Sequence, residues 1–175
     1  MAKPPDQIHV AITCADASVA VMTIITAEYA RGDKARWKID PSIAYIEKEI
    51  ARTTSVFEAK LLPIAGWRIL EDGEIPEDRT FRNAWKDTPK GITVDMPKAR
   101  EIHKDHLREQ RAPILAALDT EYMRADEAGD TAGKKRIAKR KQELRDVTDH
   151  PAIAKAKTPD ELKAVIPPAL EKTDA

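Results

Sequence analysis

The stretch Asp78-Arg79-Thr80-Phe81-Arg82-Asn83-Ala84-Trp85 lies near the middle of the chain and separates two halves of different character. Almost all aromatic residues lie at or before it, and two long, charged, helical patterns follow it. Phe81 and Trp85 are four positions apart, so a short helix or turn over 79–85 would place both rings on one face. The stretch therefore predicts the junction between two structural regions.

Upstream of this stretch, the pattern predicts strands. Ile8–Thr13 and Val19–Thr26 are rich in β-branched residues and flank a short polar break, which is typical of a β-hairpin. Residues 27–38 carry charges and a Gly-Asp pair and predict a loop. Asp40-Pro41 predicts a helix start that leads into an amphipathic helix to about Arg52, and Trp67–Leu70 predicts a further strand.

Downstream, Asp95-Met96-Pro97 predicts a second helix start, and the helical pattern then runs to about Ala128. Pro113 lies inside this pattern. A proline within a helix costs about 3 kcal/mol, so we expect a kink near 110–112 or two helices that meet there. A short extended segment, Ile92–Val94, precedes this helix.

Two glycines between 128 and 133 end this pattern, and a further helix is expected over 132–147. The short break favours an antiparallel helical hairpin over 96–148. Its apolar stripe is thin, which favours pairing with a partner protein or with a second copy of the chain. Thr158-Pro159-Asp160-Glu161 is a capping box that opens a last short helix over 161–166.

These patterns together predict an α+β fold: a small N-terminal β-β-α-β unit, a kinked antiparallel helical hairpin and a short C-terminal helix. The expected boundaries are a domain over 1–77, a connector over 78–95 and a helical region over 96–175. The 34% of charged residues and 5% of aromatic residues favour exposed helices.

Charge and composition narrow the classes of function. The 30 basic residues equal the 30 acidic residues, so no overall attraction to nucleic acid or to an anionic membrane is expected. The single cysteine, Cys14, excludes an internal disulfide. No signal-peptide core and no apolar run of membrane-spanning length is present, so we expect a soluble, cytosolic chain at synthesis.

Three candidate sites have simpler interpretations. His103 and His106 are three apart on a helical pattern and could form part of a site for a metal-dependent enzyme, but no third ligand is evident, and a polar helix face is favoured. The basic run Lys134–Lys141 could bind nucleic acid, but acidic residues flank it and it lacks stacking aromatics, which favours a solvated face. Cys14 with His9 could form a nucleophile pair, although a small buried residue is favoured.

The aromatic pair of the central stretch has two interpretations. Phe81 and Trp85 could be core residues that join the small sheet to the helical half, or exposed anchors for a partner protein. The core interpretation is favoured because the chain has few other aromatic residues from which to build one.

Three segments resemble a known group of proteins. They are residues 75–87, which contain Phe-Arg-x-Ala-Trp; residues 94–130, with an Arg-x-x-Arg-x-Pro pattern at 108–113; and residues 137–167, with Arg-Lys-Gln-Glu-Leu-Arg-Asp at 140–146. Across residues 66–168 the chain resembles small tail proteins of bacteriophages and prophages, described as tail assembly chaperones or tail-fibre assembly proteins. Lys141 stands where the chaperones have a tryptophan-tyrosine-arginine lead-in.

The resemblance implies a non-enzymatic protein that binds a phage tail or tail-fibre component, either as an assembly chaperone or as a minor tail protein. It implies work in the bacterial cytoplasm during assembly, or a place in the virion tail, with self-association as a further expectation. It carries over no catalytic residue, metal ligand or cofactor site, and none is expected. The expected partner-binding residues are Phe81, Arg82, Trp85, Leu107, Arg111, Ile114 and Leu118.

Overall fold

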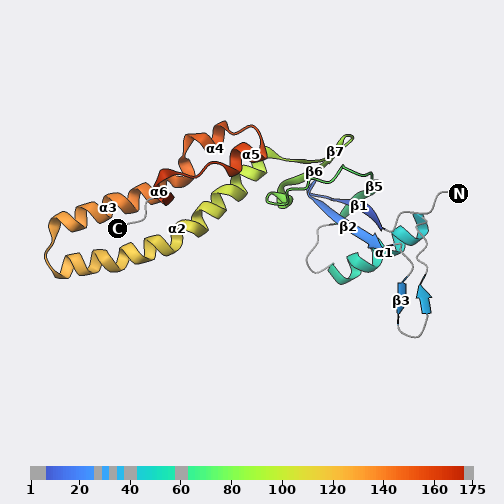
Figure 1. Cartoon of the computed structure of the whole chain (residues 1–175), viewed down its shortest axis with the longest axis horizontal. Coiled ribbons are helices and arrows are strands. Elements are labelled where there is room, and N and C mark those ends of the chain that lie inside the picture. The colour runs from blue at the N-terminus through green and yellow to red at the C-terminus, as the bar shows by residue number, and fades with distance from the viewer. Residues whose placement is uncertain (1–6, 26–28, 32–34, 38–42, 58–62, 172–175) are drawn as a thin grey trace. The chain divides into compact units, whose positions relative to one another are not determined.

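The protein is α+β, as predicted, and divides into two compact units, 1–94 and 95–175. The computed structural model describes residues 7–25, 29–31, 35–37, 43–57 and 63–171 (Figure 1). The predicted helix start at Asp40 lies outside these residues. Each unit has its own hydrophobic core and is described by itself.

The first unit is built on a three-stranded antiparallel sheet of order β2-β1-β5. The strands are β1 (Gln7–Cys14), β2 (Val19–Ile25) and β5 (Ile64–Leu70), and the predicted hairpin pairs Ile12 with Ala20. The expectation of a loop over 27–38 is wrong in part. Its ends form a second hairpin, β3 (Tyr29–Arg31) with β4 (Ala35–Trp37), in which two aromatic residues that favour strands stand opposite one another.

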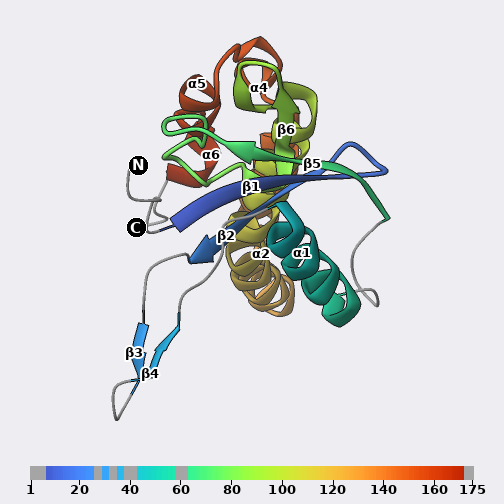
Figure 2. The ribbon, with the colours of Figure 1, turned by 90° about the vertical axis from the view of Figure 1, so that its right-hand side faces the viewer.

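Both faces of this sheet are covered, because alternate residues of a strand point to opposite sides. On one face lies α1 (Ile43–Phe57), whose Ile46 and Ile50 pack against Val10 and Ile12 (Figure 2). On the other face the intervening Ala11 packs in a separate apolar cluster.

The second cluster is completed by the segment that the sequence suggested as a connector. Residues 82–84 form a 3-10 turn, which leads into the hairpin of β6 (Trp85–Thr88) and β7 (Gly91–Val94). Trp85 and Ile92 pack there with Ala11 and Leu70. The segment up to Val94 is thus part of the first unit, because its side chains complete that unit's core. Strand β6 was not predicted.

The second unit is helical. The long helices are α2 (Met96–Glu127) and α3 (Thr131–Arg145), which run antiparallel (Figure 1). Asp95 caps α2 by accepting a hydrogen bond from the Lys98 amide, as its position predicted. A 3-10 turn over 146–149 is followed by α4 (Pro151–Lys155), α5 (Pro159–Lys163) and α6 (Pro168–Glu171), of which only α5 was expected.

Helix α2 continues through Pro113, so the expectation of two helices that meet there is wrong. Proline removes one backbone donor, which leaves the carbonyl of Glu109 without its usual partner. Glu109 and Pro113 both lie on the exposed side of the helix, where water can hydrate that carbonyl. Leu107 and Leu118 are buried on either side of the proline.

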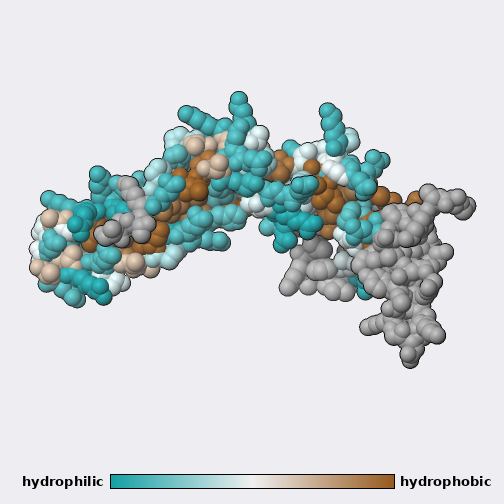
Figure 3. Space-filling view, in the orientation of Figure 1, coloured by the Kyte–Doolittle hydropathy of each residue, from teal (hydrophilic) through white to brown (hydrophobic). Residues whose placement is uncertain are grey.

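Apolar side chains gather between the helices of this unit. Leu118, Ile137 and Leu144 form its core cluster, and Ala169 and Leu170 of α6 pack against it. Figure 3 shows hydrophobic residues along the line where α3 and α6 face α2, with hydrophilic residues around them. Within the described part of the chain, no helix combines the length and the apolar character needed to cross a membrane.

Candidate functional site: a groove beside strand β2

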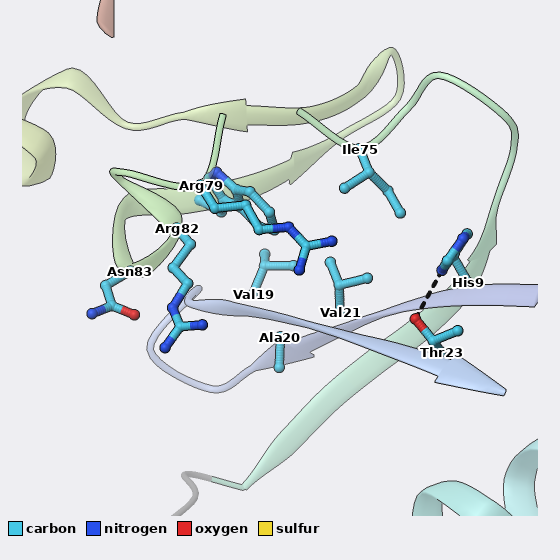
Figure 4. Close-up of a pocket in the computed structure, with 10 residues that line it drawn as sticks. His9, Val19, Ala20, Val21, Thr23, Ile75, Arg79, Arg82 and Asn83 are labelled. Atoms are coloured by element: carbon cyan, nitrogen blue, oxygen red, sulfur yellow. Dashed lines mark hydrogen bonds between the residues drawn. The ribbon is translucent and has the colours of Figure 1, made fainter. Parts of the chain in front are cut away.

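The central stretch forms one wall of an open groove in the first unit, which we call the β2 groove (Figure 4). Strand β2 and His9 of β1 form its floor, and the groove has a volume of about 310 Å³. The lining residues are His9, Val19, Ala20, Val21, Thr23, Ile75, Arg79, Arg82, Asn83 and Trp85.

Strand alternation positions the β2 side of the groove. Val19, Val21 and Thr23 are two positions apart, so their side chains share one face of the sheet. His9 is the cross-strand partner of Thr23, and its Nδ1 lies 3.0 Å from the Thr23 hydroxyl oxygen. The result is an apolar floor of two valines with a polar pair at one end.

An ion-pair network holds the segments on either side of the central stretch against the sheet. Arg68 of β5 donates to both Asp87 of β6, with Nη2 and Oδ1 2.7 Å apart, and Glu74, at 2.9 Å. The backbone oxygen of Glu74 in turn accepts from the Ile92 amide of β7. The hydrogen bonds from Arg68 lower the pKa of the Glu74 carboxyl, and those from Asp87 and Glu74 raise the pKa of Arg68. These contacts tie the 71–74 turn and the β6–β7 hairpin to the sheet.

Phe81 and Trp85 are buried, with 2% and 6% of their surface exposed. Trp85 packs against Ala11, Leu70 and Ile92, all of the same unit. Their burial makes them core residues of the first unit, while their expected role in joining the sheet to the helical half stays a prediction. Burial also makes them poor anchors for a partner, because their rings are already covered. The indole N–H of Trp85 finds no acceptor in the described part of the chain.

Arg79 and Arg82 lie on the surface of the same stretch, and both side chains extend toward β2 (Figure 4). Neither guanidinium makes an ion pair or a hydrogen bond with the described residues. Two other described arginines are engaged within the chain: Arg68 binds two carboxylates, and Arg111 binds backbone carbonyl oxygens. Among the described residues, no carboxylate lines the β2 groove. The groove therefore combines an apolar floor with two uncompensated positive charges.

The expected partner-binding residues of the second unit are largely internal. Leu107 and Leu118 are 2% and 4% exposed, and Ile114 packs against the core cluster. Arg111 stands where the seam predicts an apolar residue. Its Nη1 lies 2.6 Å from the carbonyl oxygen of Arg145 and 3.2 Å from that of Leu144, at the C-terminal end of α3. A cation there stabilises the last carbonyls of a helix.

The histidine pair shows no metal site in the described part of the chain. His103 is 7% exposed, and its Nε2 lies 3.0 Å from the carbonyl oxygen of Val165, which favours Nε2–H as donor. Burial lowers the pKa of His103. The described residues contain no cluster of three or more candidate ligands.

Cys14 is buried and free. It lies five positions from His9 on the same strand, about 16 Å away at the usual rise per residue, so the two cannot form a hydrogen-bonded nucleophile pair.

The basic run is partly neutralised within the second unit. Lys134 forms an ion pair with Asp126 at 2.6 Å, and Lys141 forms one with Asp119 while its ammonium lies over the ring of Tyr122. Both carboxylates belong to α2, so these pairs bridge the two helices of the hairpin. The run thus helps to join α3 to α2, which leaves less of its charge for phosphates.

Sequence reasoning found Arg82 and Trp85 of the groove but missed the β2 side, Arg79 and Asn83. The alternation of Val19 and Val21 signalled a strand face. Nothing in the sequence placed that face beside residue 79, because the juxtaposition is long-range. No family model matches the chain, and no curated protein or solved structure matches it either.

Proposed function

We propose that this chain is a non-enzymatic, tail-associated protein of a bacteriophage or prophage, and that it binds another tail or tail-fibre component. The resemblance of residues 66–168 to tail assembly proteins supports this proposal. Its most specific motif, Phe81 to Trp85, contributes three residues, Arg82, Asn83 and Trp85, to the lining of the β2 groove. A groove with an apolar floor and two arginines that pair with no described residue suits recognition of a protein segment, since arginine is enriched among the residues that dominate binding energy.

In this proposal the two units have different roles. The β2 groove of the first unit is the contact surface, and Arg82 is the only one of the seven expected partner-binding residues that is exposed among the described residues. In the second unit, ion pairs between α2 and α3, together with the Arg111 cap, supplement the thin apolar seam. The hairpin can therefore close on itself without a partner for that seam.

Deletion of the gene from the phage or prophage that carries it tests the role. We expect fewer complete tails in electron micrographs and a lower titre of infectious particles, both restored by the wild-type gene on a plasmid. Mass spectrometry of purified particles then separates a virion component, which is retained, from a chaperone, which is absent. Normal tails and a normal titre in the deletion strain would refute the proposal.

A further inference from the structure

We infer that the β2 groove binds an extended, acidic segment of its partner, which adds as a strand to the free edge of β2. The inference rests on the proposed function for the identity of the partner as a tail protein. The binding chemistry itself rests on the groove alone.

The charge of the groove favours an acidic ligand. Arg79 and Arg82 face a groove whose lining, among the described residues, contains no aspartate or glutamate. Glu71, Asp72 and Glu77 line a neighbouring hollow, which shares His9, Ile75 and Arg79 with the groove. None of the three forms an ion pair with Arg79. Carboxylates of a ligand can pair with these two cations, for which the described residues supply no partner, since arginine binds a carboxylate with two parallel hydrogen bonds.

The outer edge of β2 favours an extended ligand. β2 is at one end of the sheet order β2-β1-β5, so among the described strands it pairs with β1 alone. In an antiparallel pair, hydrogen-bonded and non-hydrogen-bonded residue pairs alternate. The amide of Cys14 bonds to the carbonyl of Ser18, which makes the pair of Thr13 with Val19 a non-hydrogen-bonded one, and that of Ala11 with Val21 likewise.

The backbone N–H and C=O groups of Val19, Val21 and Thr23 consequently point away from β1. No backbone hydrogen bond from them to the described residues outside the sheet is present. An exposed row of such groups is a template for an added strand.

The positive charge of the groove and the outer edge of β2 lie at the same place. The residues with outward-facing backbone groups are the ones whose side chains line the groove. A strand beside β2 therefore places every second side chain on the face toward which Arg79 and Arg82 extend (Figure 4). Acidic residues at those alternate positions satisfy the arginines, while the peptide backbone satisfies the edge.

The test uses the full chain and three fluorescein-labelled octapeptides: alternating Glu-Val, alternating Lys-Val, and the Glu-Val sequence with every backbone nitrogen methylated. Fluorescence anisotropy gives the Kd of each. We expect binding of the Glu-Val peptide that weakens as salt is added. We expect much weaker binding of the Lys-Val peptide, which has the wrong charge, and of the N-methylated peptide, which keeps its carboxylates but cannot donate backbone hydrogen bonds.

Three double variants assign the binding to the groove. Arg79→Ala with Arg82→Ala should raise the Kd of the Glu-Val peptide about tenfold. The matched control, Arg108→Ala with Arg124→Ala, removes two exposed arginines of α2 and should leave it unchanged. Arg79→Glu with Arg82→Glu should reverse the preference, so that the Lys-Val peptide binds better.

The inference is overturned if the Glu-Val peptide fails to bind at millimolar concentration, or if it binds the Arg79→Ala/Arg82→Ala variant as tightly as the Arg108→Ala/Arg124→Ala control. Equal binding of the N-methylated peptide would overturn strand addition. Failure here leaves the tail role standing, because the gene deletion tests that role separately. Normal tails in the deletion strain would likewise leave the peptide binding intact.

Discussion

Phe81→Ala should destabilise the first unit strongly, because the ring is 2% exposed. Loss of the buried ring forfeits about 2–3 kcal/mol of transfer free energy. The space it leaves adds about 1–2 kcal/mol if the surroundings relax only partly, so the total is about 3–5 kcal/mol. If Phe81 were instead a free anchor for a partner, truncation would cost about 0.5 kcal/mol or less. Arg82→Ala, at the neighbouring exposed position, serves as the matched control.

The distribution of tryptophans makes this measurement specific. Trp37, Trp67 and Trp85 all lie in the unit spanning 1–94, so tryptophan fluorescence during urea unfolding reports on that unit. We expect the midpoint for Phe81→Ala to fall by about 2–3 M urea, and that for Arg82→Ala to stay near the wild-type value. A loss below about 1 kcal/mol for Phe81→Ala would refute its assignment to the core.

Three further predictions concern the two units separately. His103 has a folded-state pKa below its ordinary value, so protonation favours the unfolded chain. The free energy of unfolding of the second unit should therefore fall as pH drops below about 6.5. By circular dichroism this slope should largely vanish in His103→Gln and persist in His106→Gln; an unchanged slope in His103→Gln would contradict the burial argument. Arg111→Met should destabilise the second unit by about 1–2 kcal/mol, because it removes the charged cap of α3. Arg108→Met, which breaks only an exposed ion pair with a neighbouring aspartate, should cost less than about 0.5 kcal/mol. Equal losses of stability for the two variants in urea unfolding would contradict a stabilising role of Arg111 at the end of α3. Gly91→Ala should destabilise the first unit by more than about 1 kcal/mol. The reason is that residue 91 has φ +114 and that an added Cβ would lie 3.2 Å from a backbone oxygen of the 71–74 turn. A stability equal to wild type in the tryptophan fluorescence assay would show that the turn shifts to accommodate the methyl group.

Local sequence signals predicted most of the elements. The β-branched runs on either side of residues 15–18 gave the β1–β2 hairpin, and Asp95 before Pro97 gave the start of α2. Thr158 likewise caps α5, by accepting from the Glu161 amide. These features depend on residues only a few positions apart, which is why the sequence alone reveals them.

The errors have non-local causes. Strand β6 was missed because Asp87 and its neighbours have the composition of a loop, whereas Arg68, nineteen positions away, holds them against the sheet. The break expected at Pro113 did not occur because the proline faces solvent while the buried leucines on either side keep the helix packed. The role of Arg111 in the apolar seam could not be predicted, because the carbonyl oxygens that it binds, on α3, lie 33 and 34 positions away in the sequence.

Sequence patterns predicted only part of the candidate site. The central stretch was singled out by its aromatic and basic residues, but which of them face outward depends on the sheet they cover. Burial of Phe81 and Trp85 leaves Arg79, Arg82 and Asn83 as the exposed part of that stretch in the groove. The proposed binding surface is therefore formed by the arginines and not by the aromatic rings beside them.

Site-specific photo-crosslinking in cells that are assembling tails tests the central claim most directly. A photoreactive amino acid replaces Asn83, an exposed residue that lines the β2 groove, and, as a control, Lys139, an exposed residue of α3. Irradiated adducts are purified and identified by mass spectrometry. We predict that position 83 crosslinks to a tail or tail-fibre protein, through a peptide rich in acidic residues, and that position 139 does not. Absence of tail proteins from the adducts at position 83, or equal capture at both positions, would contradict the account.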